Sequence, residues 1–247
     1  MSLFDFFSKK SDRYAASRPQ YPDALYTYLV SQCTEREQVW DCGTGNGQAA
    51  ISLSKHFKQV YATDLSEQQI LNAFQGPNIH YSVQPAEETH FADAAFDAIT
   101  VAQALHWFNH ARFWTEVNRV LKPGGLFAAW GYDFSSITPQ IDAMVKELIL
   151  DVIAPYWSPR VQLLWNGYRD IEFPFKRIET PAFQITNKWN LYAYLEYIHT
   201  WSATRECIEQ QGKTFFEQAA RKLEDCWGYP NLPRPVIMPL TLLVGRK

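Results

Sequence analysis

Cysteine is scarce in this sequence, with four residues among 247. Cys33, Cys42, Cys207 and Cys226 include no C-x-x-C pair and show no zinc-type spacing. They are interpreted as reduced thiols of a cytoplasmic protein, and no metal site is expected.

Excess charge and long apolar runs are also lacking. The formal net charge is −3 and no run of Lys or Arg forms a basic stripe, which argues against a nucleic-acid partner. No stretch is apolar for the length that a bilayer requires, so no membrane partner is expected. The start MSLFDFFSKKSDRY lacks the order of charges and apolar residues that is typical of a secretory signal.

What the chain does contain is enough apolar material for a core. Hydrophobic residues make up 47% of the sequence and aromatic residues 15%, which argues against disorder. A chain of 247 residues is long enough for one large domain or two small ones.

Strand and helix patterns alternate between residues 37 and 131. Ser66 is expected to cap one of the helices, and KPGG at 122–125 reads as a turn. This alternation predicts an α/β fold, doubly wound around a mostly parallel sheet, with helices on both faces. The expected strands are 38–42, 59–65, 78–83, 96–103 and 126–130, and the expected helices are 47–57, 66–75 and 111–121.

The regular pattern ends after Gly131. We read the remainder as completing the same domain with an insertion near 131–172; a separate substrate domain is the alternative, although no linker-like composition marks it. Pro239 predicts that the last strand is an edge strand, bulged or shortened. The sequence indicates helices at 138–157, 191–202 and 213–227, and strands at 175–186 and 235–246.

The turn after the first strand, VWDCGTGNGQAA (39–50), has three glycines at alternate positions. Gln48 occupies the place of the third glycine of the dinucleotide fingerprint, and no Gly-Lys-Ser/Thr follows, so a pyrophosphate is disfavoured. Backbone N–H groups in such a turn suit a single carboxylate as well as a phosphate, and Asp41 suits an ammonium. The turn is therefore predicted to hold the amino-acid end of a ligand.

Asp64 follows the second strand, about 20 residues after the glycine turn, where an acidic residue takes ribose hydroxyls. An amino-acid end joined to a ribose describes S-adenosylmethionine. The alternative is that Asp64 only caps a helix, a role for which Ser66 is better placed.

These motifs resemble class I S-adenosylmethionine-dependent methyltransferases over residues 12–131. The resemblance rests on DCGTGNG, Asp64, AEETHF, FDAITVAQALHWF and RVLKPGGLFAAW, in that order. RYAASRPQYPDAL and QALHWF resemble the type 11, trans-aconitate methyltransferase-like branch, which methylates small molecules. ETH at 88–90 departs from the usual Leu-Pro of the family, which affects the expected adenine contacts.

The resemblance implies a Rossmann-like, seven-stranded sheet with an insertion after the fifth strand. Residues 1–247 would form one domain. Within it, 1–36 would be a helical lid, 37–131 the cofactor-binding core, 132–172 a helical insertion covering the acceptor site, and 173–247 the part that completes the sheet.

The resemblance also assigns cofactor contacts. The methionine part would be surrounded by Asp41, Gly43, Gly45 and Gly47, with Gln103 near the methyl group; Asp64 would bind the ribose, Leu65 the adenine face, and Ala86 with Glu87 its polar edge. For Glu87, a solvated loop carboxylate is an equal alternative.

Four residues are candidates for positioning the acceptor. His106 would act as a base or hold a loop or substrate by a hydrogen bond, and Trp107 would line the pocket or pack. Tyr14 and Arg18 would belong to the lid, with Arg18 binding a carboxylate and Tyr14 and Tyr21 lining the cavity; a plain surface helix is the alternative.

The expected function is in-line methyl transfer from S-adenosyl-L-methionine to a small molecule, a carboxylic acid being one candidate, with S-adenosyl-L-homocysteine as product. A monomer or weak homodimer is expected. The alternatives are a non-catalytic binding module and an NAD-type oxidoreductase, against which the loop spacing argues.

Overall fold

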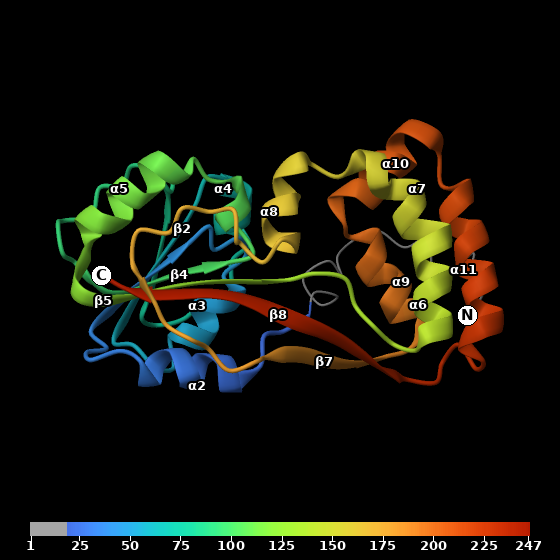
Figure 1. Cartoon of the computed structure of the whole chain (residues 1–247), viewed down its shortest axis with the longest axis horizontal. Coiled ribbons are helices and arrows are strands. Elements are labelled where there is room, and N and C mark those ends of the chain that lie inside the picture. The colour runs from blue at the N-terminus through green and yellow to red at the C-terminus, as the bar shows by residue number, and fades with distance from the viewer. Residues whose placement is uncertain (1–18) are drawn as a thin grey trace. The chain divides into compact units, whose positions relative to one another are not determined.

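The computed structural model describes residues 19–247, which fall into two compact units (Figure 1). The sheet unit comprises residues 20–133, 160–184 and 239–247. The helical unit comprises Pro19 with residues 134–159 and 185–238.

A mostly parallel sheet is the centre of the sheet unit. Its strands follow the order β3-β2-β1-β4-β5-β8-β6. β7, which pairs β8 off this path, and the first residues of β8 belong almost entirely to the helical unit. The first five strands are parallel, and β8 runs antiparallel to β5 and β6. The predicted Rossmann-like α/β fold is confirmed, with eight strands among the described residues where seven were expected. The strands are β1 (Gln38–Cys42), β2 (Gln59–Asp64), β3 (Ile79–Val83), β4 (Phe96–Ala102), β5 (Leu121–Tyr132), β6 (Lys176–Arg177), β7 (Gln184–Trp189) and β8 (Arg234–Arg246).

Helices cover both faces of this sheet (Figure 1). Successive side chains of a strand point to opposite faces, so Val39 joins one apolar cluster and Trp40 the other. The first cluster includes residues of α2 and α3, and the second includes residues of α5 and α8. The helices of the sheet unit are α2 (Asp23–Ser31), α3 (Gln48–Leu53), α4 (Glu67–Leu71), η1 (Leu105–Trp107), α5 (His110–Val120) and α8 (Gln162–Trp165), with η4 (Pro159–Val161) before α8.

The amphipathic sequence of α5 explains its place. Phe113, Val117 and Val120 are fully buried, and their spacing puts them on one side of the helix. Burying side chains of this size contributes about 1.5–3 kcal/mol each. Asn109 caps the helix by accepting a hydrogen bond from the backbone N of Arg112 at 3.3 Å.

The helical unit is built around α11. This helix contacts α6 and α9, and α10 contacts α7, α9 and η3. The helical segment predicted at 138–157 is confirmed, and its middle part, η2, is a π-helix. The elements are α6 (Pro139–Val145), η2 (Lys146–Leu150), α7 (Asp151–Ile153), η3 (Ala154–Tyr156), α9 (Leu191–His199), α10 (Ser202–Gln211) and α11 (Thr214–Trp227).

Two local predictions were wrong. KPGG is not a turn between elements but an irregular part of β5, where Gly124 has φ +76° and the register with β4 shifts. The single strand predicted at 175–186 is divided into β6 and β7, and Pro181, which has no N–H to donate, lies between them.

Pro239 lies within a long β8 but just outside the part that pairs with β5. That pairing runs from Leu240, opposite Tyr132, to Arg246, opposite Leu126. The proline is therefore accommodated at the end of the paired stretch. The predicted insertion at 132–172 is shared between the units, with 134–159 in one and 160–172 in the other, and the predicted domain layout stays a prediction.

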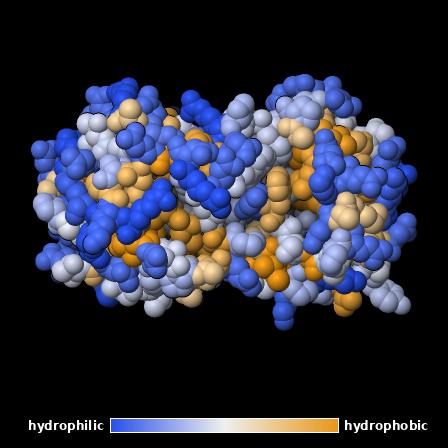
Figure 2. Space-filling view, viewed as in Figure 1, coloured by the Kyte–Doolittle hydropathy of each residue, from blue (hydrophilic) through white to orange (hydrophobic). Residues whose placement is uncertain are grey.

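Hydrophobic and hydrophilic areas alternate on the face drawn in Figure 2. Within residues 19–247, we find no helix with the length and apolar character needed to cross a membrane.

Candidate functional site

The glycine loop after β1 adopts backbone angles that favour glycine. Gly43, Gly45 and Gly47 have φ values of +69°, +57° and +82°. A Cβ on Gly43 would lie 2.7 Å from Ala104 Cβ, and one on Gly47 would lie 2.1 Å from the Tyr81 hydroxyl oxygen. At Gly45, by contrast, a Cβ would meet no atom within 4 Å. Gly43 and Gly47 thus permit close packing, whereas Gly45 borders open space that a ligand can enter.

Asp64 lies against this loop at the end of β2. Its Oδ2 accepts a hydrogen bond from the backbone N of Gly45 at 2.8 Å, and its Oδ1 accepts one from the backbone N of Ser66 at 2.9 Å. A carboxylate has about four lone-pair sites, so both oxygens retain acceptor capacity for a diol. Leu65 follows with 71% of its surface exposed. Ser66 caps α4 as predicted.

Asp41 is fully buried beneath the loop, which the sequence did not indicate. Its Oδ2 accepts from the Thr44 hydroxyl at 2.6 Å and its Oδ1 from the Thr100 hydroxyl at 3.0 Å. Burial raises the pKa of Asp41 to about 6, although the two threonine hydrogen bonds lower it. Both carboxylate oxygens of Asp41 are thus held by threonine hydroxyls beneath the loop.

Gln103 occupies a left-handed backbone conformation, with φ +57°, directly after β4. Its side chain forms a pair of hydrogen bonds with Tyr132 at the end of β5: Nε2 donates to the carbonyl O at 3.0 Å, and Oε1 accepts from the backbone N at 2.7 Å. A side chain held in this way fixes the carboxyl ends of the two neighbouring strands. Non-glycine residues in this conformation cluster at functional sites.

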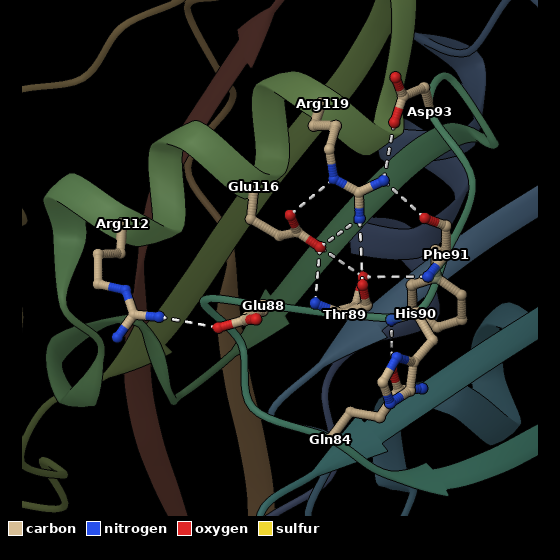
Figure 3. A network of polar contacts seen from close by, with 9 residues as sticks. All are labelled: Gln84, Glu88, Thr89, His90, Phe91, Asp93, Arg112, Glu116 and Arg119. Carbon is tan, nitrogen blue, oxygen red and sulfur yellow. Dashed lines mark hydrogen bonds and ion pairs between the residues drawn. The ribbon is translucent and has the colours of Figure 1, made fainter.

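Ala86 and Glu87 lie in the loop between β3 and β4. Ala86 is buried in the apolar cluster of the α5 side. Glu87 is half-buried, and its Oε1 accepts from the backbone N of Asn109 at 2.8 Å, so it is not simply a solvated carboxylate. Polar contacts between α5 and the next residues of the loop are drawn in Figure 3.

His106 and Trp107 form the short helix η1 after Gln103. His106 is 4% exposed, and burial, followed by the nearby His110, lowers its pKa to about 4. Its Nδ1 has no hydrogen-bond partner among the described residues. Trp107 is 44% exposed, and its ring centroid lies 4.8 Å from that of His106. A neutral imidazole and an exposed indole thus adjoin at the end of β4.

The predicted lid is described only from Pro19 onward. Tyr14 and Arg18 lie outside the described residues. Tyr21 makes an edge contact with Trp130, with ring centroids 5.7 Å apart, and a tilted contact with Tyr132. Helix α2 follows and packs its buried residues into the core of the sheet unit.

The predictions from the sequence did not include three residues that contact the glycine loop or Asp41. Thr44 and Thr100 hold Asp41, and Tyr81 packs on Gly47 while its hydroxyl donates to the carbonyl O of Phe74 at 2.6 Å. For Thr44, the position of a hydroxyl-bearing residue directly after the first glycine could have indicated a hydrogen bond within the loop. The other two lie in different strands, and only the parallel register brings them to the loop.

No group of three or more His, Cys, Asp or Glu side chains within residues 19–247 is placed to hold a metal ion.

Comparison with known proteins gives matches that include this site. A family model described as a methyltransferase domain matches residues 40–129. A Dictyostelium discoideum protein named as a methyltransferase is 33% identical over 213 residues, which is 85% of this chain and 81% of that protein. A Saccharomyces cerevisiae protein named as an S-adenosylmethionine-dependent methyltransferase is 28% identical over 132 residues, covering 50% of this chain and 45% of that protein.

A solved structure extends the similarity to most of the chain. It is described as a type II methyltransferase from Anaeromyxobacter dehalogenans, with 39% identity and a TM-score of 0.86. The match covers 93% of this chain and 97% of that one.

Proposed function

Because this chain belongs to the class I S-adenosylmethionine-dependent methyltransferases, we propose that it methylates a small molecule that carries a carboxylate. The observation that supports a carboxylate is the position of Arg160. Its Nη1 donates to the carbonyl O of Trp107, which brings a guanidinium to the turn after β4. Arginine suits carboxylates because its planar group can form two parallel hydrogen bonds with them.

The residues of the glycine loop fit the cofactor, S-adenosyl-L-methionine. When bound, it supplies a methyl group on a positively charged sulfur. The open space at Gly45 would receive the amino-acid end, the Asp64 carboxylate would accept from the ribose hydroxyls, and Leu65 would cover the adenine. Asp41 would add negative charge beneath the loop, which favours a cationic ligand.

The rest of the site would position the acceptor. A carboxylate acceptor has no proton to lose, so no general base is required, and His106 would donate or accept a hydrogen bond. Trp107 would line the acceptor side with its exposed ring. Holding the acceptor oxygen in line with the methyl carbon and the sulfur can lower the barrier by about 7 kcal/mol in favourable cases.

Several further predictions stay proposals. They are the trans-aconitate-like branch, the lid with Tyr14 and Arg18, a cytoplasmic location, a monomer or weak homodimer, and no nucleic-acid partner. Membership of the methyltransferase family argues against the NAD-type oxidoreductase. The other alternative is a non-catalytic binding module, and a measurement of turnover distinguishes it from an active methyltransferase.

The test is transfer of a labelled methyl group from S-adenosyl-L-methionine to a fractionated extract of small metabolites. A methyl ester of a carboxylic acid is cleaved by mild base and releases labelled, volatile methanol. We expect base-labile label with the wild type, less of it with Arg160→Ala, and no change with Arg169→Ala, another exposed arginine of the same segment.

Base-stable labelled products would contradict the carboxylate acceptor. No transfer to any fraction, despite cofactor binding, would favour the non-catalytic alternative.

A further inference from the structure

One side of α5 carries a row of polar residues that begins at its cap. Asn109, Arg112, Glu116 and Arg119 follow one another at intervals of three and four, which places them on one side of the helix. We call this row the polar stripe. It contacts the loop between β3 and β4 along residues 87–94, and the contacts of Arg112, Glu116 and Arg119 with side chains and carbonyls of this loop are drawn in Figure 3.

The contacts follow the order of both segments. The backbone N of Asn109 donates to Glu87 Oε1 at 2.8 Å, and Arg112 Nη2 donates to Glu88 Oε2 at 3.0 Å. The Arg112–Glu88 pair is largely exposed, with 63% and 78% of the two side chains accessible. It therefore contributes only about 0–1 kcal/mol to the stability of the fold.

Glu116 makes the buried contact of the row. Its side chain is 8% exposed, and its Oε1 accepts from the backbone N of Thr89 at 2.8 Å and from the Thr89 hydroxyl at 2.5 Å. Arg119 Nη2 donates to the same oxygen at 2.7 Å. Burial alone would raise the pKa of Glu116, but the bonds from Arg119 and Thr89 hold it below its usual range. Glu116 is therefore ionised and makes charge-assisted hydrogen bonds, which are the stronger kind.

Arg119 fastens the rest of the loop. Its guanidinium donates to the carbonyl O atoms of Phe91 at 2.6 Å and Thr89 at 3.2 Å, and to Asp93 Oδ1 at 2.8 Å. Its own carbonyl O accepts from the backbone N of Ala94 at 2.9 Å. Two loop carbonyls and one loop carboxylate thus accept from one guanidinium, so the path of the loop depends on where Glu116 holds that cation.

This arrangement links the stripe to the cofactor, because the same loop carries Ala86 and Glu87. We propose that Glu116 is a positioning residue for the adenine end of the cofactor, acting through Thr89 on the loop. The inference rests on the proposed binding of S-adenosyl-L-methionine. It also explains the ETH sequence at 88–90, where the family has Leu-Pro: the threonine provides the two donors that Glu116 binds.

The experiment compares two ligands by calorimetry on the full chain. S-adenosyl-L-homocysteine has both the adenine and the amino-acid end, whereas 5′-methylthioadenosine has only the adenine end. Thr89→Val removes the hydroxyl donor without changing the size of the side chain, and Thr89→Ser keeps that donor. We expect Thr89→Val and Glu116→Gln to bind both ligands about tenfold more weakly, which is about 1.4 kcal/mol. Thr89→Ser should bind them as the wild type does.

Asp97→Asn is the control for general destabilisation. Asp97 is a buried carboxylate at the start of β4, away from the carboxyl end of the sheet. It accepts from the backbone N atoms of Glu37 and Gln38 at 2.8 Å each and pairs with Lys122. This variant should melt at a lower temperature but bind both ligands normally.

Three results would overturn the proposal: unchanged affinities in Thr89→Val, a loss confined to S-adenosyl-L-homocysteine, or an equal loss in Asp97→Asn. If Glu116→Gln does not fold, the two Thr89 variants decide. Failure of the wild type to bind S-adenosyl-L-homocysteine would instead contradict the proposed function.

Discussion

Because the Asp41 carboxylate is buried, keeping it ionised lowers the free energy of unfolding. Burial raises the pKa of Asp41 to about 6. Its ordinary value is about 3.9, and a difference of one in pKa corresponds to about 1.4 kcal/mol, so the ionised form destabilises the fold by about 3 kcal/mol at neutral pH. Asp41→Asn removes this charge while keeping the shape and one acceptor oxygen.

The sign of the pH dependence follows from the raised pKa. Between about pH 4 and pH 6 the folded protein holds the Asp41 proton that the unfolded chain has lost, so this contribution to stability falls as the pH rises. One poorer hydrogen bond to a threonine costs the variant about 1 kcal/mol. We therefore expect Asp41→Asn to be about 2 kcal/mol more stable than the wild type at pH 7.5, with a much smaller difference near pH 5.

Urea unfolding followed by tryptophan fluorescence at the two pH values measures this difference. Calorimetry with S-adenosyl-L-homocysteine should show the opposite effect on function, with binding weakened about tenfold because the fixed charge beneath the loop is lost. Asp97→Asn is the contrasting control. The carboxylate of Asp97 is paired with Lys122, so loss of this charge should destabilise the fold at pH 7.5. If Asp41→Asn were less stable than the wild type at pH 7.5, or differed from it equally at both pH values, the ionised Asp41 carboxylate would not destabilise the fold.

Three further predictions concern the same region. Gly47→Ala should destabilise the fold by more than about 2 kcal/mol in urea, because its Cβ would collide with Tyr81; Gly45→Ala should cost only about 1 kcal/mol while weakening cofactor binding more strongly. Tyr168→Phe should leave stability unchanged or raise it by about 1 kcal/mol, because the buried hydroxyl has no partner among the described residues; a clear loss in urea unfolding would show otherwise. His106 should stay neutral in an NMR titration from pH 8 to pH 5.5; because its pKa is lowered to about 4, stability should fall as the pH drops from about 6.5 toward 4, and His106→Gln should reduce that slope.

Local periodicity was enough to predict the sheet and the position of the glycine loop. The alternating strands and helices predicted a mostly parallel sheet, and the spacing between the loop and Asp64 predicted that both serve one ligand. The structure joins them by a hydrogen bond of 2.8 Å. The turn at 122–125 was misread because Gly124 also fits the left-handed position of an irregular strand.

Contacts between residues that are far apart in the sequence could not be predicted. The buried Asp41 accepts a hydrogen bond from Thr100, which follows it by 59 residues and reaches it through the pairing of β1 with β4. The polar stripe was not among the predictions, although its spacing on one helix can be read from the sequence. Its partner cannot be read in this way, because a loop without periodicity does not show which helix it contacts.

The central claim is that the glycine loop and Asp64 hold S-adenosyl-L-methionine. Calorimetric titration of S-adenosyl-L-homocysteine into the wild type and Asp64→Ala tests it most directly. We expect the wild type to bind with micromolar affinity, a binding free energy of about −8 kcal/mol, and the variant to bind at least about tenfold more weakly. No binding by the wild type, or equal affinity in Asp64→Ala, would contradict it.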